Sequence, residues 1–414
     1  MVTPWQELNV RPCSTAGLQP GSPWPTRGYC SARQGRSPLA WTPGARERWS
    51  YSLLVGQSVG QPIDQDAELA VAADGTVYAV ASLSDPAATS GMGVVALSPD
   101  GQLVWQLPVD GVPAPGFSIG VDGTLYTTST PSVTDAQGHL AGYLHAVAPD
   151  GQVRWRLDLG GPLGEPAIGA DGTIYVSSGQ RLYAVRSDAT MAWTYTYGGT
   201  SPDTSAGPSS FAIAIGSDGT LHTWAQGAVE AVSPVGARLW RAPFTGVTST
   251  HELAVGVDGS VMYGEDGTGS IYALSPSDGS VRWSVPSNGH LGILGDPAAI
   301  MTPDLTTESL IERDVLGNAI WSSGAALIFA PCGLGDVQLA TADAASLYVV
   351  TSAHTNHSEF TGDLTVIDRL GVVTPLIRYR ANFAYTRITS RPVVASDSVM
   401  YLVTAPGVLH AIGP

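Results

Sequence analysis

The stretch PAIGADGTIYVSSGQRLYAVRSDATMAW, residues 166–193, decides the fold class of this chain of 414 residues. It contains an apolar run, an Asp-Gly turn, a second and a third apolar run, another turn and a segment carrying Trp193. Asp-Gly between two apolar runs is a strong hairpin signal, because glycine adopts a positive φ without steric cost. The stretch therefore predicts four short antiparallel strands, A to D from the inside of the molecule outward.

The same pattern recurs along almost the whole chain. A sheet of four strands cannot bury both of its faces alone, so such units stack around an axis. Clear Asp-Gly anchors stand at Asp74, Asp122, Asp171, Asp218 and Asp258, in steps of 48, 49, 47 and 40 residues, and weaker anchors near Thr302–Asp304, at Asp343 and at Asp397. The sequence thus predicts an all-β protein, an eight-bladed β-propeller of four-stranded antiparallel blades.

The strand D positions and the two chain ends predict how the blades are joined. Large rings that can wedge between blades occur at Trp105, Trp155, Trp193, Trp240, Trp283 and Trp321. The last unit, residues 391–414, supplies strands A to C only, whereas RERWSYSL at Arg46–Leu53 reads as a strand D with Trp49 in the tryptophan position. We expect this N-terminal strand to complete the last blade and close the ring, which removes its open edge.

Composition excludes several classes of function. The formal net charge is −16 and all 19 basic residues are arginine, so the chain has neither a Schiff-base lysine nor a phosphate-binding Gly-Lys loop. An acidic chain without basic clusters does not suit nucleic acid. We expect no transmembrane segment, since no run of about twenty apolar residues occurs.

Arginine-only usage suggests a bacterial protein. We expect it to be extracytoplasmic, periplasmic or secreted, with a signal outside this sequence; the cytoplasm is the alternative.

The repeats and the segment WPTRGYCSARQGRSP (Trp24–Pro38) resemble the PQQ-like propeller superfamily, whose architecture is similar to that of WD repeats. This superfamily includes quinoprotein alcohol dehydrogenases and the propeller lipoprotein of the bacterial outer-membrane assembly machinery. The resemblance covers residues 24–414, which we expect to form a single propeller domain. Residues 1–23, rich in Pro and Gly, are expected to be a flexible lead-in.

For the dehydrogenase branch, the resemblance implies PQQ in the funnel beside a disulfide of adjacent cysteines, with Ca²⁺ held by Glu, Asn and Asp. This chain has no adjacent cysteines, and its arginines could hold the PQQ carboxylates only around Arg387 and Arg391. We therefore expect no cofactor, with PQQ or a divalent cation as the alternative.

The three cysteines, Cys13, Cys30 and Cys332, match no metal or redox spacing. Cys332 could pair with Cys30 or stay a buried free thiol.

The rim formed by the D–A and B–C connections carries long loops and is expected to be the functional face, whereas the Asp-Gly rim is structural. Counting back from the turns places a set of charged residues where the inner strands begin: Glu68, Glu165, Glu252, Asp296, Asp336 and Arg391. These would form an acidic mouth that binds a cation, an amine or a basic peptide. A second candidate, a metal site, is His354, His357 and Glu359 in a B–C loop.

The sequence favours a non-catalytic, monomeric scaffold that presents its loop-rich face to a protein, peptide or carbohydrate. Candidate contact residues are Tyr195, Tyr197, Tyr385 and Arg387, because aromatic and arginine residues anchor interfaces. The alternative is a lyase, hydrolase or cyclase that uses Glu252 or Asp296 as acid or base beside His251.

Overall fold

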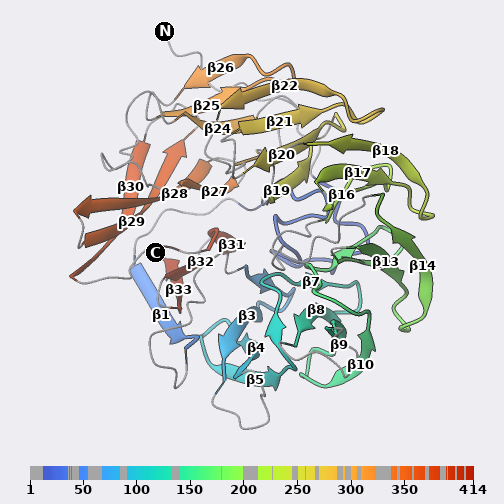
Figure 1. Cartoon of the computed structure of the whole chain (residues 1–414). Coiled ribbons are helices and arrows are strands. Elements are labelled where there is room, and N and C mark those ends of the chain that lie inside the picture. Colours follow the sequence, from blue (N-terminus) through green and yellow to red (C-terminus); the bar gives the residue numbers. More distant parts are fainter. Residues whose placement is uncertain are drawn as a thin grey trace.

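The structure is a computed structural model (Figure 1). It describes residues 13–35, 37, 39, 46–54, 68–83, 91–131, 140–178, 180–198, 213–225, 227–244, 250–256, 258–265, 270–286, 292–293, 300–304, 309–322, 337–342, 346–356, 359–368, 373–382, 388, 390–396, 399–404 and 407–414. In this part of the chain all regular elements are β-strands, so the all-β prediction is confirmed. No helix in it is long and apolar enough to cross a membrane.

The described strands form eight antiparallel sheets, numbered here in chain order. Sheet 1 holds β2 (Ala70–Val71), β3 (Val77–Ser82), β4 (Met92–Leu97) and β5 (Leu103–Pro108). Sheet 2 holds β6 (Val112–Pro113), β7 (Ser118–Ile119), β8 (Leu125–Thr130), β9 (Tyr143–Val147) and β10 (Val153–Asp158). Sheet 3 holds β11 (Ala167–Ile168), β12 (Ile174–Ser177), β13 (Arg181–Val185) and β14 (Met191–Thr196). Sheet 4 holds β15 (Ile213–Ile215), β16 (Leu221–Ala225), β17 (Ala228–Val232) and β18 (Arg238–Pro243).

Sheet 5 holds β19 (Thr250–Val255), β20 (Val261–Glu265), β21 (Ser270–Leu274) and β22 (Val281–Pro286). Sheet 6 holds β23 (Gly292–Ile293), β24 (Ile300–Asp304), β25 (Ser309–Arg313) and β26 (Ala319–Ser322). Sheet 7 holds β27 (Val337–Ala342), β28 (Ser346–Asn356), β29 (Glu359–Asp368) and β30 (Val373–Asn382). Sheet 8 holds β31 (Val393–Ser396), β32 (Val399–Thr404), β33 (Val408–Gly413) and β1 (Arg46–Ser52). Figure 1 shows the sheets arranged around a common centre, in chain order from blue to red.

The Asp-Gly turns act as structural hairpins, as the sequence predicts. In sheet 1 the Asp74 carboxylate accepts a hydrogen bond from the backbone N–H of Thr76, two residues on. The same bond recurs at Asp122, Asp171, Asp218 and Asp258. Because one carboxylate oxygen of each aspartate is used within its own turn, these aspartates shape the turn.

Tryptophans of the outer strands join neighbouring sheets. In six cases the indole N–H donates to a backbone carbonyl in the C–D turn of the following sheet at 2.8–2.9 Å: Trp49 to Pro99, Trp105 to Pro149, Trp155 to Ser187, Trp193 to Pro234, Trp240 to Pro276 and Trp283 to Val315. Gly101 and Gly151 have positive φ in two of these turns, and a Cβ added there would meet the Trp49 or Trp105 ring at 2.5 and 2.7 Å. Glycine at these positions lets the ring lie flat on the turn.

Sheet 8 contacts sheet 1 at both its core and its outer strand. β1 pairs with β33 in antiparallel register, with Trp49 opposite Ala411. One core cluster joins apolar residues of both sheets, among them Val71 and Tyr401. The backbone N–H of Ser82 in sheet 1 donates to the carbonyl of Leu53, just beyond β1. The first and last described strands are therefore part of one packed region.

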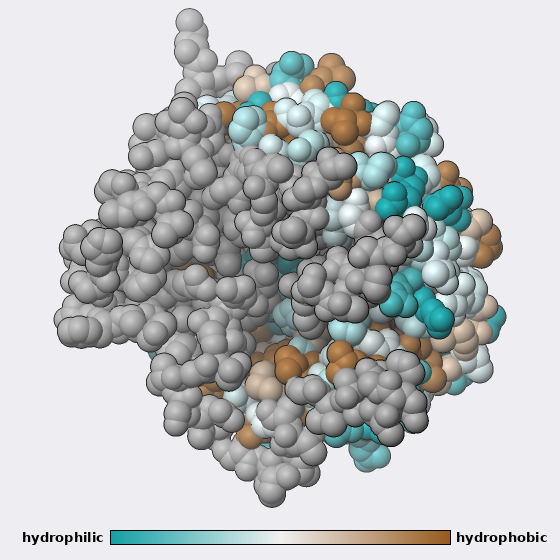
Figure 2. Space-filling model, viewed as in Figure 1, coloured by the Kyte–Doolittle hydropathy of each residue, from teal (hydrophilic) through white to brown (hydrophobic). Residues whose placement is uncertain are grey.

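The outer strands keep an exposed face. β5, β10, β14 and β22 are mostly exposed or half-buried, whereas the middle strands are buried. Apolar residues stand on this outer face, including Leu103, Val153 and Val281. Figure 2 shows hydrophobic and hydrophilic residues interspersed around the coloured edge of the molecule.

Sheet 6 departs from the predicted register. The sequence aligns Pro297 with Pro166 and so places the inner strand after Asp296, whereas the structure has β23 (Gly292–Ile293) in the inner position and β24 (Ile300–Asp304) as the second strand. The sequence between the first two strands of this sheet contains no Asp-Gly pair. The alignment of Pro297 with Pro166 therefore had no hairpin turn to fix the ends of the strands. Asp296 therefore follows the inner strand rather than preceding it.

Candidate functional site

The centre of the arrangement is occupied by the segment at residues 13–35, which we call the axial segment. It forms backbone hydrogen bonds with inner strands of four sheets, and a side-chain bond from Ser31 to the Ile168 carbonyl reaches sheet 3. The backbone partners are Gln19 and Pro25 with Ile119, Trp24 with Val71, Ser31 with Ile215, and Ala32 with Val255. The axial segment thus contacts sheets 1 to 5 (Figure 1).

The prediction that residues 1–23 form a flexible lead-in is wrong for residues 13–23. Leu18 is 2% exposed and forms a β-bridge with Gly120, and Ser22 is buried with its hydroxyl donating to the Val71 carbonyl. A Cβ on Gly17 would fall 1.9 Å from the Gly169 carbonyl oxygen, so the chain passes directly against sheet 3 here. These residues are packed because their backbone pairs with inner strands that have no other neighbour on that side.

The axial segment brings two arginines to the predicted acidic mouth. Arg27 forms ion pairs with Glu68 at 3.1 Å and Glu165 at 2.6 Å, and Arg33 pairs with Glu165 at 3.1 Å. Arg391 lies 3.8 Å from Glu68. The Glu68 and Glu165 side chains are 3% exposed. Three of the predicted residues, Glu68, Glu165 and Arg391, therefore meet in space, but as a buried ion-pair network.

The electrostatics of this network are set by its arginines. Clustered carboxylates alone would raise one another's pKa. Burial does act to raise the pKa of Glu165, but Arg27 and Arg33 outweigh it, so this pKa lies below its ordinary value. Because Glu68 and Glu165 are already paired and shielded from solvent, the prediction that they bind a cation or amine ligand is wrong for these two residues.

Sheet 2 has glycine where its neighbours have an acidic residue. A Cβ on Gly116 would lie 2.6 Å from Cδ of Glu165, so any side chain there would displace the carboxyl group. Glycine at this position leaves the space that the Glu165 side chain fills. The sequence alignment of Gly116 with Glu68 and Glu165 thus has a steric explanation.

The remaining residues of the predicted mouth have no described side chains. His251 and Glu252 lie in β19, with Glu252 opposite Gly264, and only their backbone is described. Asp296 and Asp336 lie outside the described residues. The acid–base role predicted for His251, Glu252 and Asp296 stays a prediction.

Two residues of the predicted metal set, His354 and Glu359, lie in strands rather than in a loop. His354 lies in β28 opposite Phe360, and Glu359 begins β29, so the connection between these strands is short. His357 lies outside the described residues. Within the part of the chain that the structure describes, no three His, Cys, Asp or Glu side chains group closely enough to hold a metal ion.

The predicted contact tyrosines are packed rather than free. Tyr197 is 4% exposed, and its hydroxyl lies 2.6 Å from Ser177 Oγ and 3.2 Å from Thr223 Oγ1. Tyr195 is half-buried and donates to the buried Glu230 carboxylate at 2.5 Å. The prediction that Tyr197 is a surface contact is therefore wrong. The hydroxyl of Tyr195 is used in a hydrogen bond to a buried carboxylate. Tyr385 and Arg387 lie outside the described residues.

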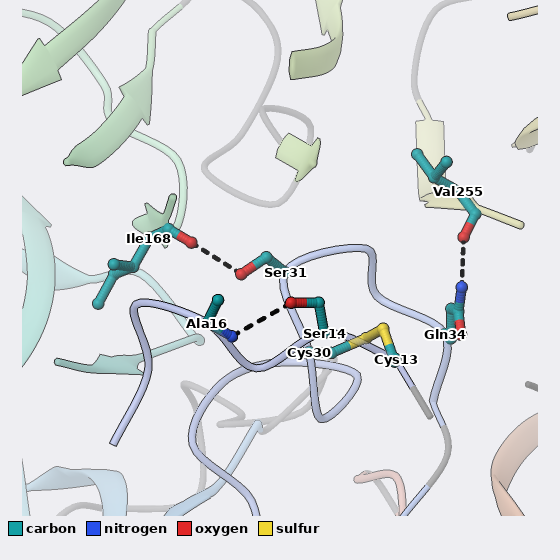
Figure 3. Close-up of a disulfide and its surroundings, with 8 residues drawn as sticks. All are labelled: Cys13, Ser14, Ala16, Cys30, Ser31, Gln34, Ile168 and Val255. Atoms are coloured by element: carbon teal, nitrogen blue, oxygen red, sulfur yellow. Dashed lines mark hydrogen bonds between the residues drawn. A yellow bond between two sulfur atoms is a disulfide. The ribbon is translucent and has the colours of Figure 1, made fainter. Parts of the chain in front are cut away.

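Cys30 forms a disulfide with Cys13, at a Cα–Cα separation of 6.1 Å (Figure 3). Of the two alternatives left open for Cys332, pairing with Cys30 is therefore wrong, because the axial segment folds back and brings Cys13 to Cys30. Cys332 lies outside the described residues. The disulfide closes a loop within the axial segment and does not itself join it to a sheet.

The described residues do not fit the quinoprotein cofactor site that the resemblance implies. Its disulfide joins adjacent cysteines, whereas Cys13 and Cys30 are separated by 17 positions. The two inner carboxylates that could assist a Ca²⁺ ion, Glu68 and Glu165, are held by arginines. The axial segment also runs along the inner strands where a flat cofactor would need open space.

Comparison with known proteins agrees with the repeat pattern. The family model described as outer membrane protein assembly factor BamB matches residues 91–222 and 225–412. The structure is similar to that of BamB from Moraxella catarrhalis, with 14% identity, a TM-score of 0.51 and coverage of 86% of this chain and 99% of that chain. It also matches a catalytically inactive virginiamycin B lyase from Staphylococcus aureus crystallised with quinupristin, with 10% identity, a TM-score of 0.48 and coverage of 88% and 99%.

No curated protein matches the chain in sequence. The family model nevertheless spans well over half of the residues, and it covers most of the repeats from which the sequence predicts the propeller. The chain therefore belongs to the PQQ-like repeat propeller family described as outer membrane protein assembly factor BamB.

Proposed function

We propose that the chain is a non-catalytic binding propeller that presents its loop-rich rim to a protein partner. The observation that carries the proposal is the filled centre: the axial segment lies against the inner strands of five sheets, and its arginines neutralise Glu68 and Glu165. An enzyme of this architecture needs an accessible central pocket with a reactive group in it. Among the described residues the centre supplies packing and charge compensation instead.

The proposal includes a closed, eight-bladed ring that acts as a monomeric scaffold. The pairing of β1 with β33 and the bond from Trp49 to the Pro99 carbonyl support closure, because β1 completes sheet 8 and its tryptophan makes with sheet 1 the contact that also joins sheets 1 to 6. A ring without open sheet edges is a rigid support for rim loops. Similarity to an assembly factor favours a protein over a peptide or carbohydrate as the partner.

We place the protein outside the cytoplasm of a bacterium. The Cys13–Cys30 disulfide supports this location, because disulfides persist in oxidising compartments and are rare in the cytosol. The family description points the same way, since it names the outer membrane. The acid–base alternative with His251, Glu252 and Asp296, and the metal alternative with His354, His357 and Glu359, have no described side-chain contact in their favour.

Site-specific photo-crosslinking tests the proposal within one sheet. Gln180 lies in the B–C connection of sheet 3, on the loop-rich rim, and Asp188 lies in the C–D turn on the opposite rim; both are exposed. A photoreactive residue at Gln180 should give a discrete protein adduct that excess unmodified chain suppresses, and the same residue at Asp188 should not. Equal adducts from both positions, or none from Gln180, would contradict the loop-rich rim as the binding face.

A further inference from the structure

A cavity of about 230 Å³ lies between the axial segment and the Asp-Gly turns of sheets 3 to 5. This is the rim opposite to the one that we propose for protein binding. Its walls include Ser14, Ser31 and Gln34 from the axial segment and Ala170, Ile215 and Val255 from the sheets. Figure 3 shows the Cys13–Cys30 disulfide beside Ser14 and Gln34, and Cys13 itself lines the cavity.

Among the described residues, one buried polar atom of this wall has no hydrogen-bond partner. Gln34 is 4% exposed, and its Nε2 donates to the Val255 carbonyl at 2.9 Å. Its Oε1 is buried and accepts no hydrogen bond from any described residue. If the amide were turned over, Oε1 would face the Val255 carbonyl oxygen and the two acceptors would repel. The bond to Val255 therefore shows that the atom without a described partner is the acceptor Oε1. Buried acceptors in native proteins are almost always satisfied, which points to a donor that binds here.

The walls define the chemistry of that donor. No lining residue is ionisable, since Cys13 is in the disulfide, and most of the lining is alanine, glycine, isoleucine and valine. A charged ligand would be desolvated without compensation, which is costly. The volume equals that of about eight water molecules at about 30 Å³ each, less than the pockets that hold drug-sized ligands.

We infer that this cavity is a binding site for a small neutral molecule with an apolar body and one hydroxyl or amide N–H donor, recognised by Gln34 Oε1. The Ser31 hydroxyl is already satisfied by donating to the Ile168 carbonyl, although its oxygen can still accept, whereas Gln34 Oε1 has no described partner. The Ser14 hydroxyl accepts from the Ala16 N–H and keeps its own proton for a ligand acceptor. The site is independent of the partner surface proposed above, so either proposal can fail alone.

The test uses the full chain with ¹³C-labelled isoleucine methyl groups, because Ile215 lines the cavity and reports on its occupancy. Three probes of similar size are titrated: 3-methyl-1-butanol with a hydroxyl donor, isobutyramide with an amide donor, and isobutyl methyl ether with none. We expect the Ile215 methyl signal to shift with saturation for the donors, and the ether to bind about five-fold more weakly. The better of the two donors identifies the ligand class.

Two matched variants assign the effect to one atom. Gln34→Met should reduce donor binding to the level of the ether. Gln19→Met, the same change in the same segment, should leave it unaltered, because Gln19 Oε1 accepts from the Ala73 N–H and lies outside the cavity wall. Equal affinity for donor and ether in the unmodified chain would overturn the inference whether or not the variants fold. So would the absence of any Ile215 shift, which would mean that the cavity holds water only.

Discussion

Arg27 and Arg33 determine how the inner carboxylates behave. Two glutamates at 3% exposure would be strongly destabilising if they were unpaired, since burying a charge is tolerated only with a partner. The arginines come from a segment that precedes the first sheet, so the charge balance of the centre depends on where that segment lies. The ion pairs therefore link the position of the axial segment to the stability of the sheets.

The cost of breaking this network should be large. Glu165→Gln leaves Arg27 and Arg33 facing a neutral amide, and we expect the free energy of unfolding to fall by about 3 kcal/mol. Asp110→Asn is the matched control, because Asp110 pairs with Arg156 at a surface site where both side chains are almost half exposed. Its effect should stay within about 1 kcal/mol. Urea titrations of both variants measure the difference; equal losses would argue against a buried network.

Two buried histidines should make the protein sensitive to acid. Burial lowers the pKa of His145 and of His222 to about 4, from an ordinary value of 6.5. Between these values the unfolded chain binds more protons than the folded one, so stability is complete above pH 6.5 and is lost as the pH falls toward 4. Each histidine should remove about 2 kcal/mol between pH 6.5 and 5.

The variant that checks this is His222→Leu, because His222 is 2% exposed and its Nδ1 has no hydrogen-bond partner among the described residues. Stability measured at pH 7, 6 and 5 should decline less steeply in the variant than in the unmodified chain. Glu165 adds a further loss below its ordinary pKa of 4.5, outside this window. An unchanged slope between pH 6.5 and 5 would show that His222 titrates normally in the folded protein.

Single elements could be predicted from the sequence wherever a local signal set their ends. The strands around Asp171 follow the predicted order, because Asp-Gly fixes the hairpin and the alternation of side chains fixes the faces. The prediction for sheet 6 is wrong where that signal is missing. It places Asp296 before the inner strand, whereas the inner strand, β23, ends at Ile293 and so comes before Asp296. Register thus depends on turn chemistry more than on a shared proline.

The axial segment could not be predicted in the same way. It has no periodic pattern, and its bonds reach partners such as Ile119 and Val255, more than 90 positions further along the chain. The meeting of Glu68 with Glu165 followed from the repeat, since equivalent positions of stacked sheets come together. The neutralisation of these glutamates by Arg27 and Arg33 could not be predicted, because it depends on a segment that lies outside the repeats and has no repeat position to align.

At the scale of the whole molecule, the position of β1 decides whether the sheets form a ring or an open arc. A repeat array is stabilised by contacts between neighbours, so an open arc would leave one interface unmade. Sheets 8 and 1 share a core cluster, and Trp49 lies on Gly101 as Trp105 lies on Gly151. If the ring is closed in solution, the interface made by the first strand should be as strong as an interface inside the array.

Two identical substitutions compare these interfaces directly. Trp49→Phe removes the bond to the Pro99 carbonyl at 2.8 Å, and Trp105→Phe removes the equivalent bond to Pro149 at 2.9 Å. In a closed ring each should lower the free energy of unfolding by about 1 kcal/mol from the lost hydrogen bond, plus a similar packing loss in both. In an open arc only Trp105→Phe should matter, because Trp49 would already be in water. Hydrogen exchange of the β1 amides separates the outcomes further, since protection equal to that of β5 requires β1 to remain paired with β33 as the structure has it.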